Sequence, residues 1–200
     1  MAILQAIKRW GLLVIIGGGV LALDQWAKQQ VVERLAYGQS WEPIPAIASV
    51  IRITRSQNAG AAFGIFPFAS DFFLALAIIT ILAFVISYPR LPSHAWLSRV
   101  SVALISGGAL SNAIDRLTMG HVVDYVHVQL TPAVSNVSNF ADHAITVGVV
   151  LLLIDQWRAE RREMEEQARA GQTAEEEALS SAEGISTSAA DESSGANSHI

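Results

Sequence analysis

Apolar residues gather in four long stretches of the chain, and charged residues stand at the ends of these stretches. The stretches cover residues 10–23, 72–88, 100–114 and 144–154. Residues 72–87 (FFLALAIITILAFVIS) lack the polar stripe of period 3.6 that marks a helix on the surface of a soluble protein. Only this stretch approaches, without a charged residue, the roughly 20 apolar residues that cross a bilayer. The pattern predicts an all-α membrane protein with four transmembrane helices. The alternative is a soluble bundle of four buried helices.

Composition favours the membrane over the soluble alternative. The 200 residues are 52% hydrophobic and 16% charged, against roughly 25% charged residues in soluble domains. The chain contains no cysteine, which excludes disulfides, thiolate metal ligands, a cysteine nucleophile and lipid attachment at cysteine.

The net charge of −5 belongs to the C-terminal part of the chain. Residues 1–157 hold nine basic and eight acidic residues, whereas residues 158–200 hold four and ten. No basic cluster could follow a phosphate backbone, so we expect no binding of nucleic acid. The pattern divides the chain into a membrane domain, residues 1–157, and a charged tail, residues 158–200. The tail continues as a helix at first, and from about Gly171 its composition predicts disorder.

Basic residues beside the spans favour one orientation in the membrane, because Lys and Arg concentrate on the cytoplasmic side. The larger group of basic residues on one side of the spans comprises Lys8, Arg9, Arg90, Arg99, Arg158, Arg161 and Arg162. This side also carries both ends of the chain, which predicts that both termini are cytoplasmic. The first stretch follows basic residues as a signal peptide would. Because three more apolar stretches follow it, we expect a retained span. The outer ends of the spans then carry Asp24, Asp71, Asp115 and Asp142.

The outer connections differ from the short inner loop. Within the first, residues 47–55 (IASVIRITR) show partial alternation and β-branched residues, which predict a small extracytoplasmic β element at the membrane surface.

An ionisable side chain within or close to the membrane is a candidate functional residue, because burying a charge there is costly. Asp24 and Lys28 are spaced i, i+4 on one helix face, where opposite charges pair. An interfacial ion pair is the structural interpretation. The alternative, Lys28 as the base of a serine protease, lacks a serine motif.

Two glycine-containing motifs bring polar side chains close to small residues. In residues 58–64 (NAGAAFG), Asn58 stands in a tight turn or in a loop that meets a peptide backbone. In residues 107–117 (GGALSNAIDRL), small residues form a face for close helix packing, and Asn112, Asp115 and Arg116 crowd its outer end. The second motif forms either a polar network that locks helices together or part of a site.

Asp124 and Asp142 are candidates for an aspartic hydrolase. Two neighbouring carboxyls share a proton, so one can activate water while the other polarises the scissile carbonyl. The alternative is a zinc site formed by His121, Asp124 and His127. The chain has no H-E-x-x-H, no G-x-S-x-G and no glycine-rich phosphate loop.

Five motifs, in order, resemble those of the lipoprotein signal peptidase (signal peptidase II) family over residues 8–157. They are Asp24-x-x-x-Lys28, NAGAAFG, GGALSNAIDR, GHVVDY at residues 120–125 and NFADHAI at residues 139–145. The resemblance implies a bacterial aspartyl protease of the inner membrane, with four spans and an extracytoplasmic active site. Such an enzyme cleaves prolipoproteins immediately before the diacylglyceryl-modified cysteine.

The resemblance also assigns residues. Asp124 and Asp142 take the positions of the catalytic pair. A further group of substrate-binding or supporting positions comprises Asp24, Lys28, Asn58, Gly108, Asn112, Asp115, Arg116, Asn139 and Ala141. We expect no metal and no cofactor, contact with membrane lipids, inhibition by cyclic peptides of the globomycin type, and a monomer.

Two positions depart from the family pattern. Ser111 stands where glycine is usual, and Tyr125 where phenylalanine is common. Two competing functions stay open, a metal-dependent membrane hydrolase and a small proton-coupled transporter that uses the buried aspartates as a relay.

Overall fold

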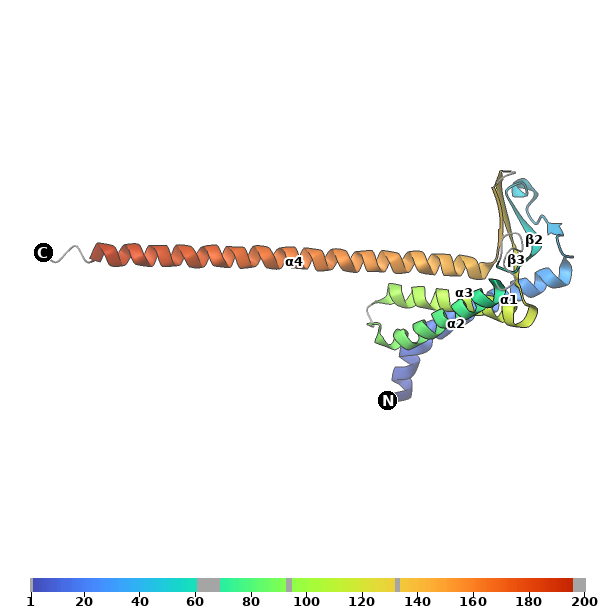
Figure 1. Ribbon diagram of the computed structural model, residues 1–200, viewed down its shortest axis with the longest axis horizontal. Helices are drawn as coiled ribbons and strands as arrows, with labels where there is room; N and C mark the ends of the chain where they lie inside the picture. The colour runs from blue at the N-terminus through green and yellow to red at the C-terminus, as the bar shows by residue number, and fades with distance from the viewer. Residues whose placement is uncertain (1, 61–68, 93–94, 132–133, 196–200) are drawn as a thin grey trace. The chain divides into compact units, whose positions relative to one another are not determined.

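The computed structural model describes residues 2–60, 69–92, 95–131 and 134–195, with the backbone alone for residues 2–9 and 173–195. The chain divides into two units, Met1–Leu153 and Ile154–Ile200. The elements, in chain order, are α1 (Ala2–Arg34), β1 (Ser40–Trp41), η1 (Pro45–Ile47), β2 (Ile51–Asn58), α2 (Ala69–Ser87), η3 (Tyr88–Arg90), α3 (Trp96–Met119), β3 (Val122–Thr131), β4 (Val134–Ser138) and α4 (Phe140–Gly195) (Figure 1).

Within the described residues, four helices are long and apolar enough to cross a membrane, which confirms the predicted spans. The candidate spans are Trp10–Arg34, Ala69–Arg90, Trp96–Met119 and Phe140–Gln172. α2 is the most apolar of them, and Ala69 is its only buried residue. Its exposed Phe72, Ile79 and Leu82 give it the all-round apolar surface that lipid tails would cover.

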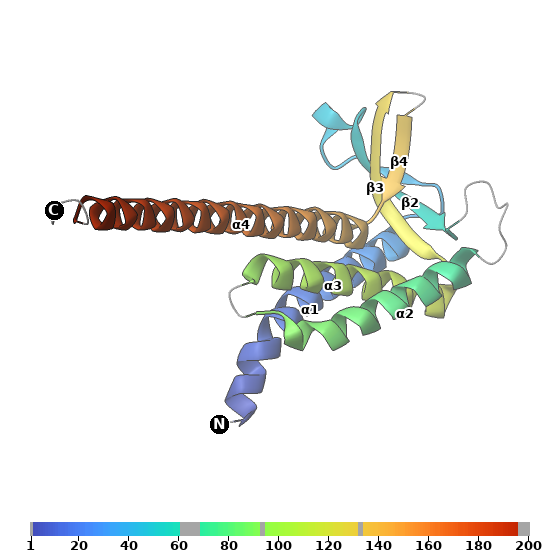
Figure 2. The ribbon, with the colours of Figure 1, turned by 60° about the vertical axis from the view of Figure 1, so that its left-hand side comes forward.

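α3 is the central helix of the first unit and packs against α1 and α2 (Figure 2). Its buried face consists largely of small residues, which allow backbones to approach. A Cβ atom on Gly107 would lie 2.5 Å from the carbonyl oxygen of Gly17 in α1, and one on Gly108 would lie 2.5 Å from that of Ala141 in α4. The predicted close-packing face of residues 107–111 is therefore used on both sides of α3.

The β element is a four-stranded antiparallel sheet of order β1-β2-β3-β4. The sheet lies beyond the C-terminal ends of α1 and α3 (Figure 2). The predicted strand in the first outer connection is present as β2. The second outer connection contributes β3 and β4. Pairing sets Ser56 opposite Asp124 and Asn58 opposite Val122, after an irregularity that follows Ile53.

The second unit is the continuation of α4. The helix runs to Gly195 and so differs from the disorder predicted from about Gly171. Every residue from Gln156 to Gln172 is exposed. Ala, Glu, Gln and Arg have high helix propensity, so helix forms here without a buried face. The assignment of residues 158–200 as a separate tail stays a prediction.

Candidate active site

Asn139 connects the two candidate catalytic carboxylates. Its side-chain Nδ2 donates to Oδ1 of Asp124 over 2.7 Å, and its backbone N–H donates to Oδ2 of Asp142 over 3.3 Å. Asp124 lies near the start of β3, Asp142 lies in the first turn of α4, and Asn139 is fully buried between these elements. The structure therefore brings together the two aspartates that the sequence predicted as a pair.

Asn139 also caps α4. Its Oδ1 accepts a hydrogen bond of 2.8 Å from the backbone N–H of Asp142, and the Asp142 carboxylate in turn accepts the backbone N–H of Asn139. This reciprocal arrangement is a capping box, with asparagine and aspartate in the roles of Ser/Thr and Glu/Gln. The Asp142 carboxylate is thus fixed by the same bonds that begin the helix.

A second amide holds each carboxylate. Asn58, at the end of β2, donates through Nδ2 to Oδ2 of Asp124 over 3.0 Å. Asn112, in α3, donates through Nδ2 to Oδ1 of Asp142 over 2.8 Å. All four carboxylate oxygens therefore accept an N–H group, and three asparagines supply the side-chain donors.

The surroundings of Asp124 favour its neutral form. Burial, followed by the nearby charge of Asp142, raises the pKa of Asp124 to about 6, although the Asn58 and Asn139 hydrogen bonds and the charge of Lys28 lower it. The Asp124 carboxyl is 2% exposed, whereas Asp142 is half-buried. One carboxyl of the pair can therefore hold a proton at pH values up to about 6, well above the ordinary range of a carboxyl, while the other faces an opening.

A buried charge cluster lies directly behind the pair. Lys28 contacts Asp24 over 2.6 Å and Asp115 over 2.7 Å, and all three side chains are at most 3% exposed. The predicted Asp24–Lys28 pair is present, and it is buried within the protein. Lys28 also donates to Oδ1 of Asn112 over 2.9 Å, which orients the opposite end of that amide toward Asp142.

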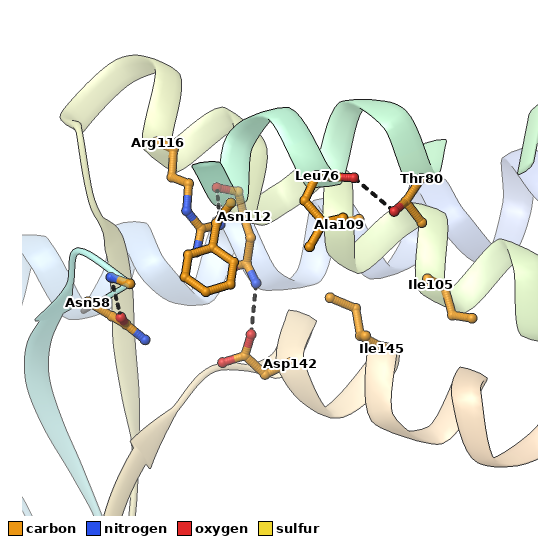
Figure 3. A pocket seen from close by; sticks show the side chains of 12 residues that line it. Asn58, Leu76, Thr80, Ile105, Ala109, Asn112, Arg116, Asp142 and Ile145 are labelled. Atoms are coloured by element: carbon orange, nitrogen blue, oxygen red, sulfur yellow. Dashed lines mark hydrogen bonds between the residues drawn. The ribbon is translucent and has the colours of Figure 1, made fainter. Parts of the chain in front are cut away.

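Asp142 faces a cavity of about 460 Å³ between α2, α3, α4 and the end of β2. Asn58, Asn112, Arg116 and Asp142 line its polar end (Figure 3). Apart from Gly60 and Thr80, whose hydroxyl donates to the carbonyl oxygen of Leu76, apolar side chains line the rest, namely Phe73, Leu76, Ala77, Ile105, Ala109 and Ile145. A ligand with a polar group at one end and a hydrocarbon part at the other fits this division.

Arg116 places a positive charge at the polar end of the cavity. Its guanidinium lies 5.5 Å from the centre of the Phe73 ring, and Nη1 donates to the carbonyl oxygen of Asn112 over 3.3 Å. Its buried Nε has no hydrogen-bond partner among the described residues. A bound carbonyl or carboxylate could accept this donor.

Comparison with known proteins decides the family. A model of the family described as Signal peptidase (SPase) II matches residues 13–158. The chain belongs to the signal peptidase II family. This confirms the resemblance seen in the five motifs, and it makes the protein a multi-pass membrane protease.

Similar proteins cover most of the first unit. The lipoprotein signal peptidase of Desulfitobacterium hafniense (strain DSM 10664 / DCB-2) is 39% identical over 152 residues, which are 76% of this chain and 97% of the relative. The lipoprotein signal peptidase of Halothermothrix orenii is 37% identical over 142 residues, which are 71% of this chain and 92% of the relative. A solved bacterial membrane enzyme superposes with a TM-score of 0.66 at 31% identity, over 74% of this chain and 88% of that one.

The remaining predicted residues of this signal peptidase II surround the pair. Ala141 donates its N–H to Oδ1 of Asp24 over 3.1 Å. Gly108 packs against that same turn, because a Cβ there would lie 2.5 Å from the carbonyl oxygen of Ala141. In the NAGAAFG motif, Gly60 has a φ of 83° and donates to Oδ1 of Asn58. Residues 61–64 of the motif lie outside the described residues.

The structure does not assemble the alternative zinc site. Asp124 and His127 are an odd number of residues apart on β3, so their side chains point to opposite faces of the sheet. His127 bonds instead to Arg52, Thr54 and Ser135. Among the described residues, no group of three or more His, Cys, Asp or Glu could hold a metal ion.

Three members of the peptidase's polar network were not among the predicted site residues. Gln25 donates to Asp115 over 2.8 Å, Ser111 donates to Asp24 over 2.6 Å, and Tyr125 donates to Asp24 over 3.3 Å. The signal available for Gln25 was its position next to Asp24, just after the apolar stretch of residues 10–23. Ser111 and Tyr125 were visible as departures from the family pattern.

Proposed function

We propose that the protein is an aspartic endopeptidase that removes signal peptides from diacylglyceryl-modified prolipoproteins, cutting immediately before the lipidated cysteine. The observation that carries this proposal is the pairing of Asp124 with Asp142 through Asn139 at the polar end of an apolar cavity. Membership of the signal peptidase II family and the relatives named lipoprotein signal peptidase support the substrate class.

Asp142 acts as the base and Asp124 as the acid in this proposal. The carboxylate of Asp142 sits at the N-terminus of α4, where the helix dipole and two N–H donors favour negative charge. Burial and the charge of Asp142 raise the pKa of Asp124 to about 6, so Asp124 carries the shared proton. This division gives each carboxyl the protonation state that its role requires.

The reaction then proceeds in two balanced steps. Asp142 takes a proton from water, the water oxygen bonds to the scissile carbonyl carbon, and Asp124 gives its proton to the carbonyl oxygen. In the second step, Asp142 returns its proton to the leaving amide nitrogen, the C–N bond breaks, and Asp124 recovers a proton from the diol. No metal or cofactor enters either step.

The cavity suits a lipidated peptide. Acyl chains would lie along Phe73, Leu76, Ile105 and Ile145 while the scissile bond reaches the polar end. In this proposal the site lies at the extracytoplasmic face of the bacterial inner membrane, with both termini cytoplasmic and membrane lipids as neighbours. Cyclic peptides of the globomycin type would compete for the same cavity, and a monomer contains the complete site.

Cleavage of a diacylglyceryl-modified prolipoprotein by the purified protein in detergent, with excess EDTA, tests the proposal. We expect cleavage immediately before the lipidated cysteine, and no cleavage of the same precursor without lipid. Activity that disappears with EDTA and returns with zinc would contradict an aspartic mechanism. A folded protein that cleaves under neither condition would contradict proteolysis altogether.

A further inference from the structure

The first turn of α4 is held by partners that come from outside the helix. The N–H of Phe140 donates to the hydroxyl of Tyr125 over 3.2 Å, that of Ala141 donates to Oδ1 of Asp24 over 3.1 Å, and that of Asp142 donates to Asn139. The first N–H groups of a helix have no partner within it. Contacts from β3, from α1 and from the cap residue therefore fix the turn that carries Asp142.

Tyr125 joins this turn to the strand of the other aspartate. A hydroxyl has one proton and two lone pairs, so Tyr125 can accept the N–H of Phe140 while it donates to Oδ1 of Asp24. Side chains of successive strand residues point to opposite faces. β3 thus directs Asp124 toward Asn58 and Asn139 and Tyr125 toward the start of α4, and one strand sets the positions of both carboxylates.

Ser111 holds the other oxygen of Asp24. Its hydroxyl donates to Oδ2 over 2.6 Å, and Lys28 contacts the same oxygen over 2.6 Å. Asp24 and Ser111 are fully buried, and Tyr125 is 6% exposed. With donors on both of its oxygens, the Asp24 carboxylate cannot rotate away from the N–H of Ala141.

The geometry points to Tyr125 and Ser111 as positioning residues of the peptidase, whose hydroxyls hold Asp24 and the first turn of α4 so that Asp142 faces Asp124. This inference rests on the proposed catalytic roles of the two aspartates. Neither hydroxyl lines the cavity, so substrate binding is not expected to depend on them. A small misplacement of a catalytic group is enough to slow the chemical step.

The charges around Tyr125 keep its hydroxyl in the form that this role requires. Burial and the charge of Asp24 raise the pKa of Tyr125 well above its ordinary value. The hydroxyl therefore stays protonated, and able to donate, over the working pH range.

The variant Tyr125→Phe removes the hydroxyl and keeps the ring. We expect kcat to fall by about tenfold, on the scale of a slightly misplaced catalytic group, with KM unchanged. Tyr88→Phe is the matched control, because Tyr88 is equally buried and its hydroxyl has no hydrogen-bond partner among the described residues. Its kcat and KM should equal those of the wild type. A Tyr125→Phe enzyme with wild-type kcat, or with a change confined to KM, would overturn the inference.

The pH profile gives a second readout that a general loss of stability would not move. The charged groups that act on Asp124 are Asp142 of α4, Lys28 of α1 and Arg116 of α3. If the first turn of α4 loosens, the charge of Asp142 raises the pKa of Asp124 less. The limb at which activity declines with rising pH should then move to lower pH in Tyr125→Phe and stay in place in Tyr88→Phe. An unmoved limb in Tyr125→Phe would contradict the positioning role.

Ser111→Ala keeps the inference testable if Tyr125→Phe does not accumulate. We expect a smaller fall in kcat at unchanged KM, because Ser111 acts on Asp24 and not on α4 directly. Full kcat in Ser111→Ala would then overturn the inference. A wild-type protein that does not cleave lipidated precursor would overturn the proposed function, whereas an active wild type with unaffected hydroxyl variants would overturn this inference alone.

Discussion

Asn139 and Asp142 are joined by two reciprocal hydrogen bonds, so the residue that begins α4 also fixes a candidate catalytic carboxylate. The N–H of Asp142 donates to the amide oxygen of Asn139 over 2.8 Å, and the N–H of Asn139 donates to the carboxylate over 3.3 Å. The remaining amide protons of Asn139 serve Asp124 and Asn112. Helix capping and the geometry of the carboxyl pair are therefore two uses of one side chain.

Two variants of Asn139 should separate these uses. Asn139→Ala removes the cap as well as the donor to Asp124, so we expect the free energy of unfolding to fall by about 1 kcal/mol and the activity to be lost. Asn139→Ser keeps a capping oxygen but no amide donor. It should unfold like the wild type in a thermal denaturation assay and still cleave poorly. Full activity in Asn139→Ser would show that the bond to Asp124 is dispensable.

The raised pKa of Asp124 predicts the pH dependence of cleavage. Asp124 must be protonated to act as the acid, so kcat/KM should decline as the pH rises through about 6. The Asn58 hydrogen bond favours the ionised form and lowers this pKa. In Asn58→Ala the pKa rises, and the declining limb should move to higher pH. A limb that moves to lower pH would refute the assignment of Asp124 as the acid.

Lys28 is expected to be essential for stability because it is the cation between two buried carboxylates. Lys28→Met leaves Asp24 and Asp115 without their shared partner, and removal of one member of a buried ion pair costs about 3–5 kcal/mol of unfolding free energy. Adding Asp115→Asn should recover part of this loss, since groups in contact are coupled. Denaturation in detergent of the wild type, Lys28→Met, Asp115→Asn and the double variant measures the coupling energy between the two residues. If the two losses of unfolding free energy simply add in the double variant, the residues do not share a network.

Gly108 allows the first turn of α4 to lie against α3. A Cβ atom at this position would meet the carbonyl oxygen of Ala141 at 2.5 Å and the Ile145 side chain at 2.8 Å. Gly108→Ala should therefore displace Asp142 and lower kcat as well as stability. The control is Gly18→Ala in α1, where a Cβ meets nothing within 4 Å and activity should not change. Equal activity of the two variants would contradict the close contact.

The features that the sequence predicted are those with a local signal. Each span contains a continuous apolar stretch, and the Asp24–Lys28 pair is a contact one turn apart in a single helix. The third member of that cluster, Asp115, depends on the packing of α1 against α3. Its connection to Lys28 could not be read from either helix alone.

The start of strand β3 could not be predicted from the sequence because it is buried on both faces. Val122, Val123, Asp124 and Tyr125 are all buried, so this half of the strand shows none of the alternation between polar and apolar positions that residues 126–131 (VHVQLT) show. Asp124 and Tyr125 occupy opposite faces, and each face is covered by a different part of the chain. The links of Tyr125 to Asp24 and Phe140 come from this burial on both sides.

The central claim is that Asp124 and Asp142 perform the cleavage, and single amide variants test it most directly. Purified Asp124→Asn and Asp142→Asn should be incubated with diacylglyceryl-modified prolipoprotein, and the products followed by mass spectrometry. The control is Asp71→Asn, an exposed aspartate in the first turn of α2. We predict wild-type cleavage by the control and no cleavage by either folded dyad variant. Full cleavage by Asp124→Asn or by Asp142→Asn would contradict the account.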